Sequence, residues 1–173
     1  MIEIREITRE NKEELNLRNE AFPLWGRMIP SLSDGVWEYR LEEFPEIGWM
    51  TFPDENYDYE LLSRNSLILG AYENGVCVGL AIYQEGFFRY MYLYDLKVNA
   101  AARRKGVGRA LIEAGYAAAK KKGNLGIYTQ AQDNNLDACL FYLGVGFEIG
   151  GFDNRVYEGT PQEDKADIFF YLK

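Results

Sequence analysis

The sequence predicts an α/β fold with one mixed sheet, and three observations support this prediction. Short apolar runs that alternate like strands recur along the chain and are separated by turn residues. From Val107 onward, apolar residues recur at helical spacing until Gly123 supplies a stop. This helix lies between the strand patterns 88–98 and 125–131, and such a crossover brings its two strands into parallel. We therefore expect a mostly antiparallel sheet with a central parallel pair and flanking helices.

The first third of the chain shows one strand and one short helix before its periodicity fades. Residues 2–8 alternate as a strand, and residues 11–22 follow as an amphipathic helix with Asn11 as the expected N-cap. Residues 23–59 hold four of the five prolines and all three tryptophans, and their periodicity is poor. We interpret this segment as helical turns and loops.

A hairpin is expected in the middle of the chain. The apolar runs 66–72 and 76–84 flank Asn74 and Gly75, and Asn-Gly between such runs is a strong hairpin signal. The tyrosine-rich run 88–98 forms the next strand and leads directly into the basic loop described below.

The remaining patterns complete one domain. Residues 136–144 have the pattern of a second helix, and terminal strands are expected within 147–157 and 166–173. No repeat, low-complexity tract or linker divides the chain. Because 173 residues are enough to bury a core, we expect a single domain, residues 1–173.

Composition excludes several classes of protein. The chain is 47% hydrophobic, yet no apolar run could cross a bilayer and the charged N-terminus does not resemble a signal peptide. We therefore expect a cytoplasmic protein, with Cys77 and Cys139 as reduced core residues. The sequence has no histidine, which removes Ser-His and Cys-His pairs and the usual zinc ligands, so no metal site is expected. A net charge of −8 argues against nucleic acid as a partner, while monomer and homodimer both stay open.

Cations crowd the beginning of the central helix, where such charges are normally unfavourable. They are Arg103, Arg104, Lys105 and Arg109, placed around Gly106 and Gly108. The amide groups at a helix N-terminus already carry partial positive charge, so added cations suit a bound anion. Neither the P-loop pattern nor the dinucleotide fingerprint is present. We interpret the loop as a site for a small polyanion, and the alternative is a solvated basic turn.

At these residues the sequence resembles the GNAT superfamily of acetyl-CoA-dependent N-acetyltransferases. The family's pyrophosphate loop, R/Q-x-x-G-x-G/A, is matched by Arg103, Gly106 and Gly108 after a strand that ends at Val98. Its downstream motif is matched at full spacing by Asn135, Ala138, Phe141, Tyr142, Gly146 and Phe147.

A closer resemblance, to the streptothricin acetyltransferase-like branch, covers almost the whole chain. It is carried by GRMIPSLSDGVWEY (26–39), FPD (52–54), YDLKV (94–98), QDNNLDACLFY and GFEIGGFD. The chain departs from that branch at YLGVGF (142–147), where relatives tend to have YEKCGF.

The resemblance implies acetyl-CoA as the cofactor and a splayed central pair of strands that receives its pantetheine arm. The residues implied in cofactor binding are Leu96, Val98, Arg103, Arg104, Lys105, Gly106, Val107, Gly108, Arg109, Asn135 and Tyr142. Asn135 could instead be a plain N-cap of its helix.

Acetyl transfer to an amine requires a base, and without histidine the base must be a carboxylate. We favour Asp95, with Glu85 as the weaker rival, and the alternative for Asp95 is a purely structural carboxylate. By resemblance, Tyr142 protonates the departing thiolate, although it could also be a core tyrosine.

The acidic and aromatic stretch before residue 60 is expected to frame the acceptor. We name Trp37, Glu38 and Asp54, with Tyr94, as candidate substrate-binding residues, because carboxylates and aromatic rings attract cations. The expected acceptor is then a small cationic amine, and the resemblance to the streptothricin acetyltransferase-like branch implies streptothricin or a similar compound. The alternatives are a protein or peptide amine N-acetyltransferase of the same fold and a non-catalytic acyl-CoA-binding module.

Overall fold

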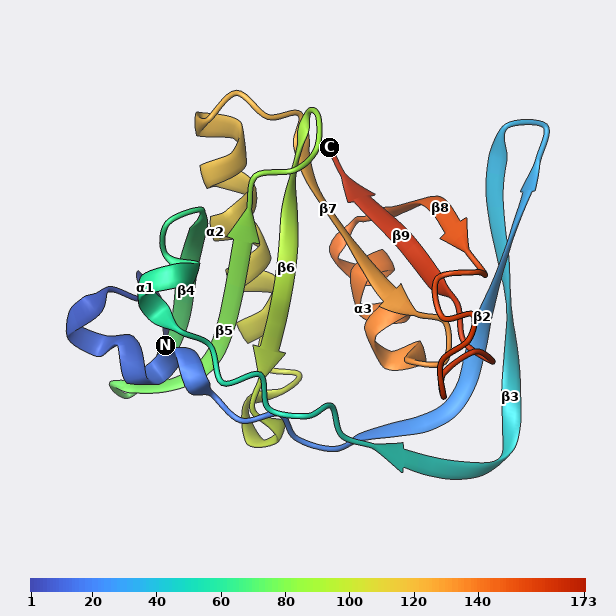
Figure 1. Ribbon diagram of the computed structural model, residues 1–173, viewed down its shortest axis with the longest axis horizontal. Coiled ribbons are helices and arrows are strands. Elements are labelled where there is room, and N and C mark those ends of the chain that lie inside the picture. The colour runs from blue at the N-terminus through green and yellow to red at the C-terminus, as the bar shows by residue number, and fades with distance from the viewer. The chain divides into compact units, whose positions relative to one another are not determined.

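The computed structural model describes all residues, Met1–Lys173, and they form two compact units (Figure 1). The first unit contains Met1–Glu20 and Thr51–Ile127, and the second contains Ala21–Met50 and Tyr128–Lys173. The prediction of a single domain over 1–173 stays a prediction.

The first unit is built on four antiparallel strands. In spatial order they are β1 (Ile2–Glu6), β4 (Ser66–Glu73), β5 (Val76–Gln84) and β6 (Tyr90–Val98). The predicted hairpin is confirmed, because Asn74 and Gly75 join β4 to β5 with positive φ angles of 53° and 79°. These angles are those that favour Asn-Gly in a tight turn.

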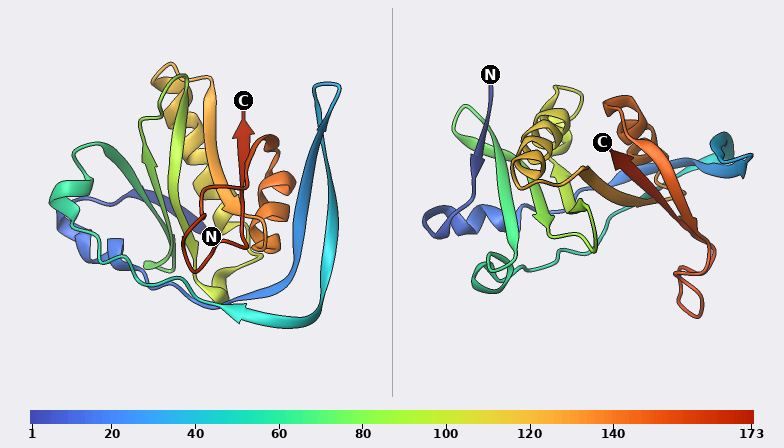
Figure 2. Two further views of the ribbon diagram at one scale, coloured as in Figure 1. Left: turned by 45° about the vertical axis from the view of Figure 1, so that its right-hand side comes forward. Right: turned by 90° about the horizontal axis from the view of Figure 1, so that it is seen from above.

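The predicted central helix is also confirmed as α2 (Val107–Lys121), which lies against one face of β4, β5 and β6 (Figure 2). The contact is close at Gly115, where a Cβ atom would lie 2.0 Å from the ring of Tyr83. The Tyr83 hydroxyl donates a hydrogen bond of 2.9 Å to the carbonyl of Leu111 in α2.

The opposite face of this sheet carries a second apolar cluster, made by Ile7, Leu15, Ile68, Leu80 and Ile82. Leu15 comes from the 3₁₀ helix η1 (Arg9–Asn16).

The predicted helix 11–22 is wrong in its bounds and in its cap. Thr8, not Asn11, is the N-cap of η1, and the Asn11 side chain accepts the Thr8 backbone N–H at 2.8 Å in a capping box. The helix therefore begins one turn earlier and ends before residue 17. Two short helices, α1 (Tyr59–Leu62) and η2 (Ala100–Ala102), complete this unit.

The second unit contains the C-terminal elements and a long hairpin. Its elements are most of β7 (Gly126–Gln132), α3 (Leu136–Val145), β8 (Glu148–Asp153), β9 (Asp167–Leu172), β2 (Phe22–Ser33) and β3 (Val36–Met50). Strands β8 and β9 pair antiparallel, and α3 packs against β2, β8 and β9. The predicted elements 125–131, 136–144, 147–157 and 166–173 are thus confirmed with small changes in their bounds.

The interpretation of residues 23–59 as helical turns and loops is wrong over 23–50. These residues form the antiparallel ribbon β2–β3, whose strands pair up to Ser33 and Val36. Asp34 and Gly35 form the turn, with φ of 50° and 77°, and Asp-Gly is a recognised hairpin turn. The prolines obscured the pattern, but a two-stranded ribbon has two free edges where proline is tolerated.

Both cysteines are free thiols, with Cys139 buried and Cys77 half-buried. No helix is long and apolar enough to span a bilayer.

Candidate active site

A one-residue bulge in β6 decides which side chains reach the candidate site in the first unit. Tyr83 pairs with Leu93, but the next residue back in β5, Ile82, pairs with Asp95, so Tyr94 is the extra residue. Tyr83 faces α2, whereas Ile82 belongs to the apolar cluster on the other face. The bulge therefore places Asp95, and with it Lys97, on the face opposite α2.

Lys97 is a buried cation with three oxygen partners. Its side chain is 6% exposed. Its Nζ forms an ion pair with Glu55, lies 3.5 Å from Asp95 Oδ2, and donates a hydrogen bond of 3.2 Å to the carbonyl of Leu17. The Lys97 ammonium also lies 5.5 Å from the ring centre of Tyr57. Lys97 thus joins the end of η1, the segment before α1 and β6.

The Asp95 carboxylate is held through one oxygen. The Tyr57 hydroxyl donates a hydrogen bond of 2.9 Å to Oδ2, which is also the oxygen nearest Lys97. Burial raises the pKa of the Asp95 carboxyl, while the charge of Lys97 and the hydrogen bond from Tyr57 oppose that rise. A carboxylate with a raised pKa is a stronger base than an ordinary aspartate, and its second oxygen, Oδ1, is not engaged in these contacts.

Tyr94 lies beside this cluster. Its ring centre is 6.2 Å from that of Tyr57 and 6.1 Å from that of Tyr92, and the residue is 44% exposed. The structure therefore brings Tyr94 together with Asp95 through Tyr57, as a partly exposed aromatic surface.

Glu85, the rival base, lies at the other end of the unit. Its Oε1 forms an exposed ion pair of 2.8 Å with Lys122, which follows the C-terminus of α2. A 15-residue helix is about 22 Å long. Glu85 is therefore remote from the basic loop at the N-terminus of α2, whereas Asp95 lies in β6, the strand that leads toward this loop.

The basic loop has the backbone expected of an anion site. Gly106 is the N-cap of α2 with φ of 83°, and no side chain caps the helix. A Cβ atom at Gly106 would find no atom within 4 Å, so the space beside the helix N-terminus is open. Arg103, Arg104 and Lys105 are exposed around it, and Arg103 Nε donates to the carbonyl of Val98 at 3.2 Å. This arrangement fits the pyrophosphate of a CoA molecule.

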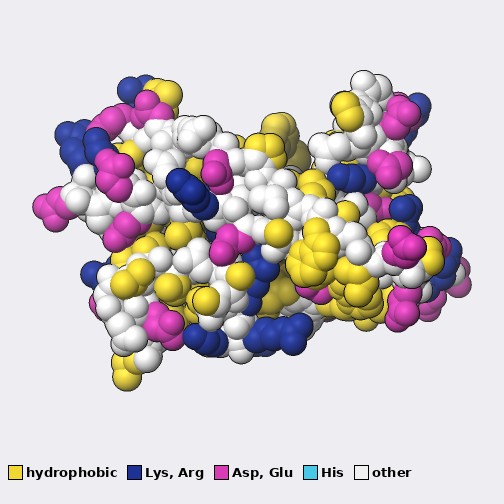
Figure 3. All heavy atoms as spheres, turned by 90° about the horizontal axis from the view of Figure 1, so that it is seen from below, with side chains coloured by type: hydrophobic (Ala, Val, Ile, Leu, Met, Phe, Trp, Pro, Cys, Tyr) yellow, Lys and Arg dark blue, Asp and Glu magenta, His cyan; other side chains and the backbone are white.

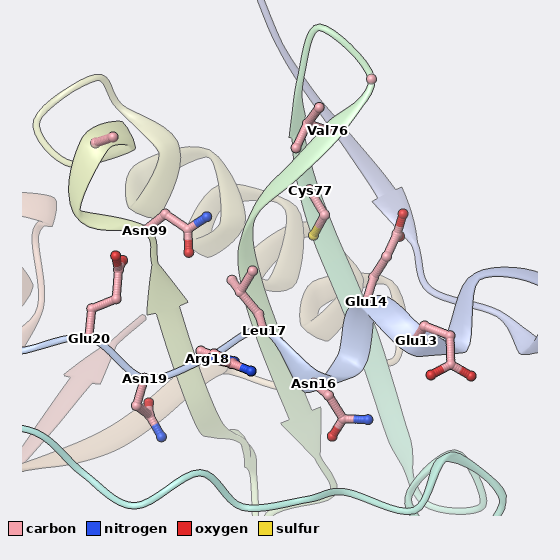
Figure 4. Close-up of a pocket in the computed structure, with 12 residues that line it drawn as sticks. Glu13, Glu14, Asn16, Leu17, Arg18, Asn19, Glu20, Val76, Cys77 and Asn99 are labelled. Atoms are coloured by element: carbon pink, nitrogen blue, oxygen red, sulfur yellow. The ribbon is translucent and has the colours of Figure 1, made fainter.

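Two depressions flank the segment that follows η1. The larger, of about 810 Å³, is lined by residues 13, 14, 16–20 and 75–77 and by Asn99 and Ala101 (Figure 4). In this view the Glu20 side chain points toward the segment that carries Asn99. Its Oε2 accepts the Ala100 N–H at 2.5 Å. The smaller, of about 340 Å³, is lined by residues 16–18 and 54–56. Asp54, a predicted substrate residue, lines it while accepting the Asn19 N–H at 2.9 Å.

Two predicted site residues lie on α3 in the second unit. Tyr142 is 7% exposed, and its ring packs against Phe141, Phe147 and Phe170 at centre distances of 5.4, 5.2 and 5.4 Å. This packing fixes the direction of the phenol. Asn135 caps the helix, because its Oδ1 accepts the Ala138 N–H at 3.3 Å.

Trp37 and Glu38 lie on β3, near the tip of the hairpin. They pair with Leu32 and Ser31, and Glu38 is exposed. Acidic and hydrophobic side chains are intermixed at the right-hand end of Figure 3, where Figure 1 places the β2–β3 hairpin. Trp37 and Glu38 thus belong to the second unit, whereas Asp54 and Tyr94 belong to the first.

Sequence reasoning missed Lys97 and Glu55 as members of the site. Asp95 and Lys97 are two apart on a strand, which places them on one face, and this spacing could have linked them. Glu55 had no such local signal, because its contact with β6 spans 42 positions of the chain.

Comparison with known proteins supplies independent information on the fold and the family. Residues 33–147 match the acetyltransferase (GNAT) family. Streptothricin acetyltransferase A of Bacillus subtilis (strain 168) is 32% identical over 172 residues, which cover 98% of this chain and 99% of that protein.

Solved structures are similar over the same length. A Bacillus anthracis str. Ames protein, crystallised in complex with acetyl coenzyme A, gives a TM-score of 0.90 at 29% identity, with 99% of each chain covered. A nourseothricin acetyltransferase gives a TM-score of 0.81 at 20% identity, covering 99% of this chain and 97% of the other. These likenesses confirm the predicted fold class, an α/β fold with a mixed, mostly antiparallel sheet, one parallel pair and flanking helices.

Proposed function

The chain belongs to the acetyltransferase (GNAT) family and is an N-acetyltransferase that uses acetyl-CoA, and from this premise we propose that it acetylates a primary amine of a small cationic molecule. Streptothricin is the first candidate acceptor, because the Bacillus subtilis relative that matches almost the whole chain is a streptothricin acetyltransferase. In this proposal the protein acts in the cytoplasm and detoxifies an antibiotic.

The chemical requirement is a neutral amine. A lysine-type amine has a pKa of about 10.4, so only about one molecule in 2500 is neutral at pH 7, which corresponds to about 4.6 kcal/mol. A positioned base that removes this proton, directly or through one water, commonly contributes about 100-fold to 10,000-fold in rate.

Asp95 is the proposed base, and its geometry is the observation that carries the proposal. Oδ2 is held by Tyr57 and Lys97, which leaves Oδ1 to receive a proton. Because burial raises the pKa of this carboxyl, its proton affinity moves toward neutral pH, where a general base is most effective. Asp95 must be ionised to act, so the acid limb of the rate profile should lie above the range of an ordinary aspartate.

The remaining residues bind and orient. Acetyl-CoA supplies an activated acyl group as a thioester. The loop cations from Arg103 to Arg109 and the amides of Gly106, Val107 and Gly108 hold its pyrophosphate. Leu96 and Val98 offer backbone groups of β6 to the pantetheine arm and the acyl carbonyl.

Tyr142 is the proposed acid, and the acceptor is guided by charge. The phenol, with an ordinary pKa of about 10, can protonate a thiolate of pKa about 8.5 at small cost. Asp54, Glu38, Trp37 and Tyr94 draw in the distal positive charge of the acceptor rather than the reacting nitrogen. A carboxylate against the reacting ammonium would raise its pKa and oppose deprotonation.

The test is an acetyl-transfer assay that follows free thiol with an amine panel of streptothricin, spermidine, free lysine and a lysine-containing peptide. We expect the highest kcat/KM for streptothricin. Turnover of the peptide alone would indicate a protein acetyltransferase, and no turnover with any amine would overturn the proposed function.

Asp95→Asn tests the base in the same assay. The rate near neutral pH should fall by about 100-fold or more and recover in part at alkaline pH, where the amine loses its proton unaided. Glu85→Gln is the matched control and should keep the parent's rate and pH profile. An Asp95→Asn enzyme with the parent's profile would make Asp95 structural.

A further inference from the structure

Asp95 lies in a cluster of polar side chains on a face of the sheet that is otherwise apolar. The cluster joins three segments of the first unit: residue 17 after η1, residues 55 and 57 before α1, and residues 95 and 97 in β6. Asp95 and Lys97 of β6 pair with Ile82 and Leu80 of β5, which are two members of the apolar cluster. An apolar side chain at position 97 would suit these neighbours.

A buried ion pair is a poor way to stabilise a fold. Removing a lysine and a carboxylate from water costs several kcal/mol per ion, and well-packed hydrophobic residues are often as stable or more stable. The Lys97 side chain is nevertheless 6% exposed and that of Asp95 17%. The charges therefore need an explanation other than stability.

The members of the cluster are also linked to one another and to neighbouring backbone groups by further contacts. Glu55 Oε2 pairs with Lys97, while its Oε1 accepts the Asn19 side-chain amide at 2.9 Å. The Asn19 amide donates at the same time to the carbonyl of Pro53 at 2.9 Å. Glu55 is thus fixed at both oxygens, and through Lys97 it fixes β6.

Both donors that reach Asp95 meet the same oxygen. Tyr57 donates to Oδ2 at 2.9 Å and Lys97 Nζ lies 3.5 Å from Oδ2. A salt bridge selected for strength would tend to use both carboxylate oxygens. This arrangement instead engages Oδ2 and leaves Oδ1 outside both contacts.

Three charged or titratable side chains face Asp95. They are Lys97 on its own strand, and Glu55 and Tyr57 on the segment that packs over β6. Lys97 and Tyr57 favour the ionised form of Asp95, whereas Glu55 opposes it. The two effects have opposite signs, so their balance can be altered in either direction by single substitutions.

We propose that Lys97, Glu55 and Tyr57 are positioning residues that hold Asp95 with Oδ2 engaged and Oδ1 open and that set the pH at which it ionises. This inference rests on the proposed role of Asp95 as base. None of the three touches the acceptor in this scheme, and each acts through Asp95.

The experiment follows the Asp95 carboxyl directly by ¹³C NMR titration, with kcat measured against pH in parallel. Lys97→Met and Tyr57→Phe should each move the Asp95 titration and the acid limb of kcat to higher pH, by about one pH unit or more for Lys97→Met. Glu55→Gln should move both to lower pH. Acetyl-CoA affinity should stay at the parent's value in all three.

A double variant distinguishes an effect on Asp95 from a general loss of stability. Lys97→Met leaves two carboxylates without their cation and is expected to destabilise the protein, whereas Lys97→Met with Glu55→Gln removes both charges and should recover part of the stability. Its Asp95 titration should lie between those of the two single variants. Lys12→Met, an exposed lysine on η1, is the matched control and should shift nothing.

Opposite shifts for Lys97→Met and Glu55→Gln would support the proposal. An unmoved Asp95 titration in folded variants, or shifts of the same sign, would overturn it. Since the NMR titration does not depend on turnover, it distinguishes this failure from failure of the proposed function, which would appear as a parent enzyme without activity toward any amine.

Discussion

Lys97 and the cations of the loop that follows it lie within twelve positions of one another, yet their surroundings are opposite. Lys97 is buried, and the chain itself supplies its partners, Glu55, Asp95 and the carbonyl of Leu17. Arg103, Arg104 and Lys105 are exposed at a helix N-terminus that no side chain caps. The buried cation satisfies charges that belong to the fold, whereas the exposed cations make only surface contacts, such as that of Lys105 with Glu73 at 3.8 Å, and add to the positive potential at the helix N-terminus.

Cationic side chains therefore serve two purposes in this chain, one in stability and one in affinity for an anion. A cation whose partners are internal should be needed for stability and for the state of its neighbours. A cation at an uncapped helix N-terminus should be nearly neutral for stability and should affect affinity for an anion. Substitutions can therefore assign each residue to one use or the other.

The largest expected effect is on stability at Lys97. Lys97→Met should lower the free energy of unfolding by about 3–5 kcal/mol, because it leaves two carboxylates without their buried cation. Arg104→Met should change it by no more than about 0.5 kcal/mol. Chemical denaturation at neutral pH measures both, and similar losses in the two variants would contradict the comparison.

Tyr142 is buried like Lys97, but its proposed role is in catalysis and not in stability. It is packed among aromatic rings, yet Tyr142→Phe should keep the fold and the acetyl-CoA affinity while turnover falls by about 100-fold, the low end for general acid catalysis. The measurements are turnover at saturating acetyl-CoA and binding by calorimetry. Unchanged turnover would make Tyr142 a core residue, and lost affinity would make it a cofactor contact.

The loop cations should show the opposite signature to Lys97. Arg103→Ala with Arg104→Ala should weaken CoA by about 10-fold to 100-fold, since each charge-assisted hydrogen bond contributes about 1.5–3 kcal/mol. Stability should fall by no more than about 1 kcal/mol, because the exposed Arg103 loses only its hydrogen bond to the carbonyl of Val98. The loss of affinity should shrink as salt rises and should be absent for pantetheine, which lacks phosphate. Lys120→Ala with Lys121→Ala, near the other end of α2, is the control. Equal losses for CoA and pantetheine would show that the loop does not bind phosphate.

The smallest expected effect is at the two glycines that flank α2, and they form a closely matched pair. Gly106 and Gly123 have φ of 83° and 87°, and a Cβ atom at either would meet nothing within 4 Å. Alanine at either should cost about 1 kcal/mol of stability through backbone strain. Only Gly106→Ala should also weaken CoA, and calorimetry on both variants decides. Equal affinities would place the anion elsewhere.

Local signals made much of the fold predictable. Asn74 and Gly75 specified the β4–β5 hairpin, and the apolar spacing from Val107 specified α2, because both depend on neighbouring residues. The β2–β3 ribbon was not predicted because prolines at 23, 30 and 45 interrupt the alternation of its strands. Its turn nevertheless carries a local signal, Asp34 and Gly35.

The site was predictable only in part, for a different reason. Asp95 could be named because the chemistry required a carboxylate, but its engagement by Tyr57 and Lys97 depends on a bulge that the apolar pattern of β6 does not reveal. Glu55 reaches Lys97 across 42 positions of the chain. Contacts of this range follow from the packing of whole segments, which local periodicity cannot specify.

The bulge at Tyr94 fixes the side of β6 on which each following residue lies. If β6 paired regularly with β5 while keeping Tyr94 in the alternation, Asp95 and Lys97 would turn toward α2, and Leu96 and Val98 would exchange places with them. Deletion of Tyr94 would instead leave Asp95 opposite Ile82, because Leu93 already pairs with Tyr83, and would remove the bulge without changing the face of any residue that follows. Evolution of this chain should therefore tolerate many residues at position 94, and a strand shortened by this one residue, more readily than a strand that keeps its length and loses the bulge.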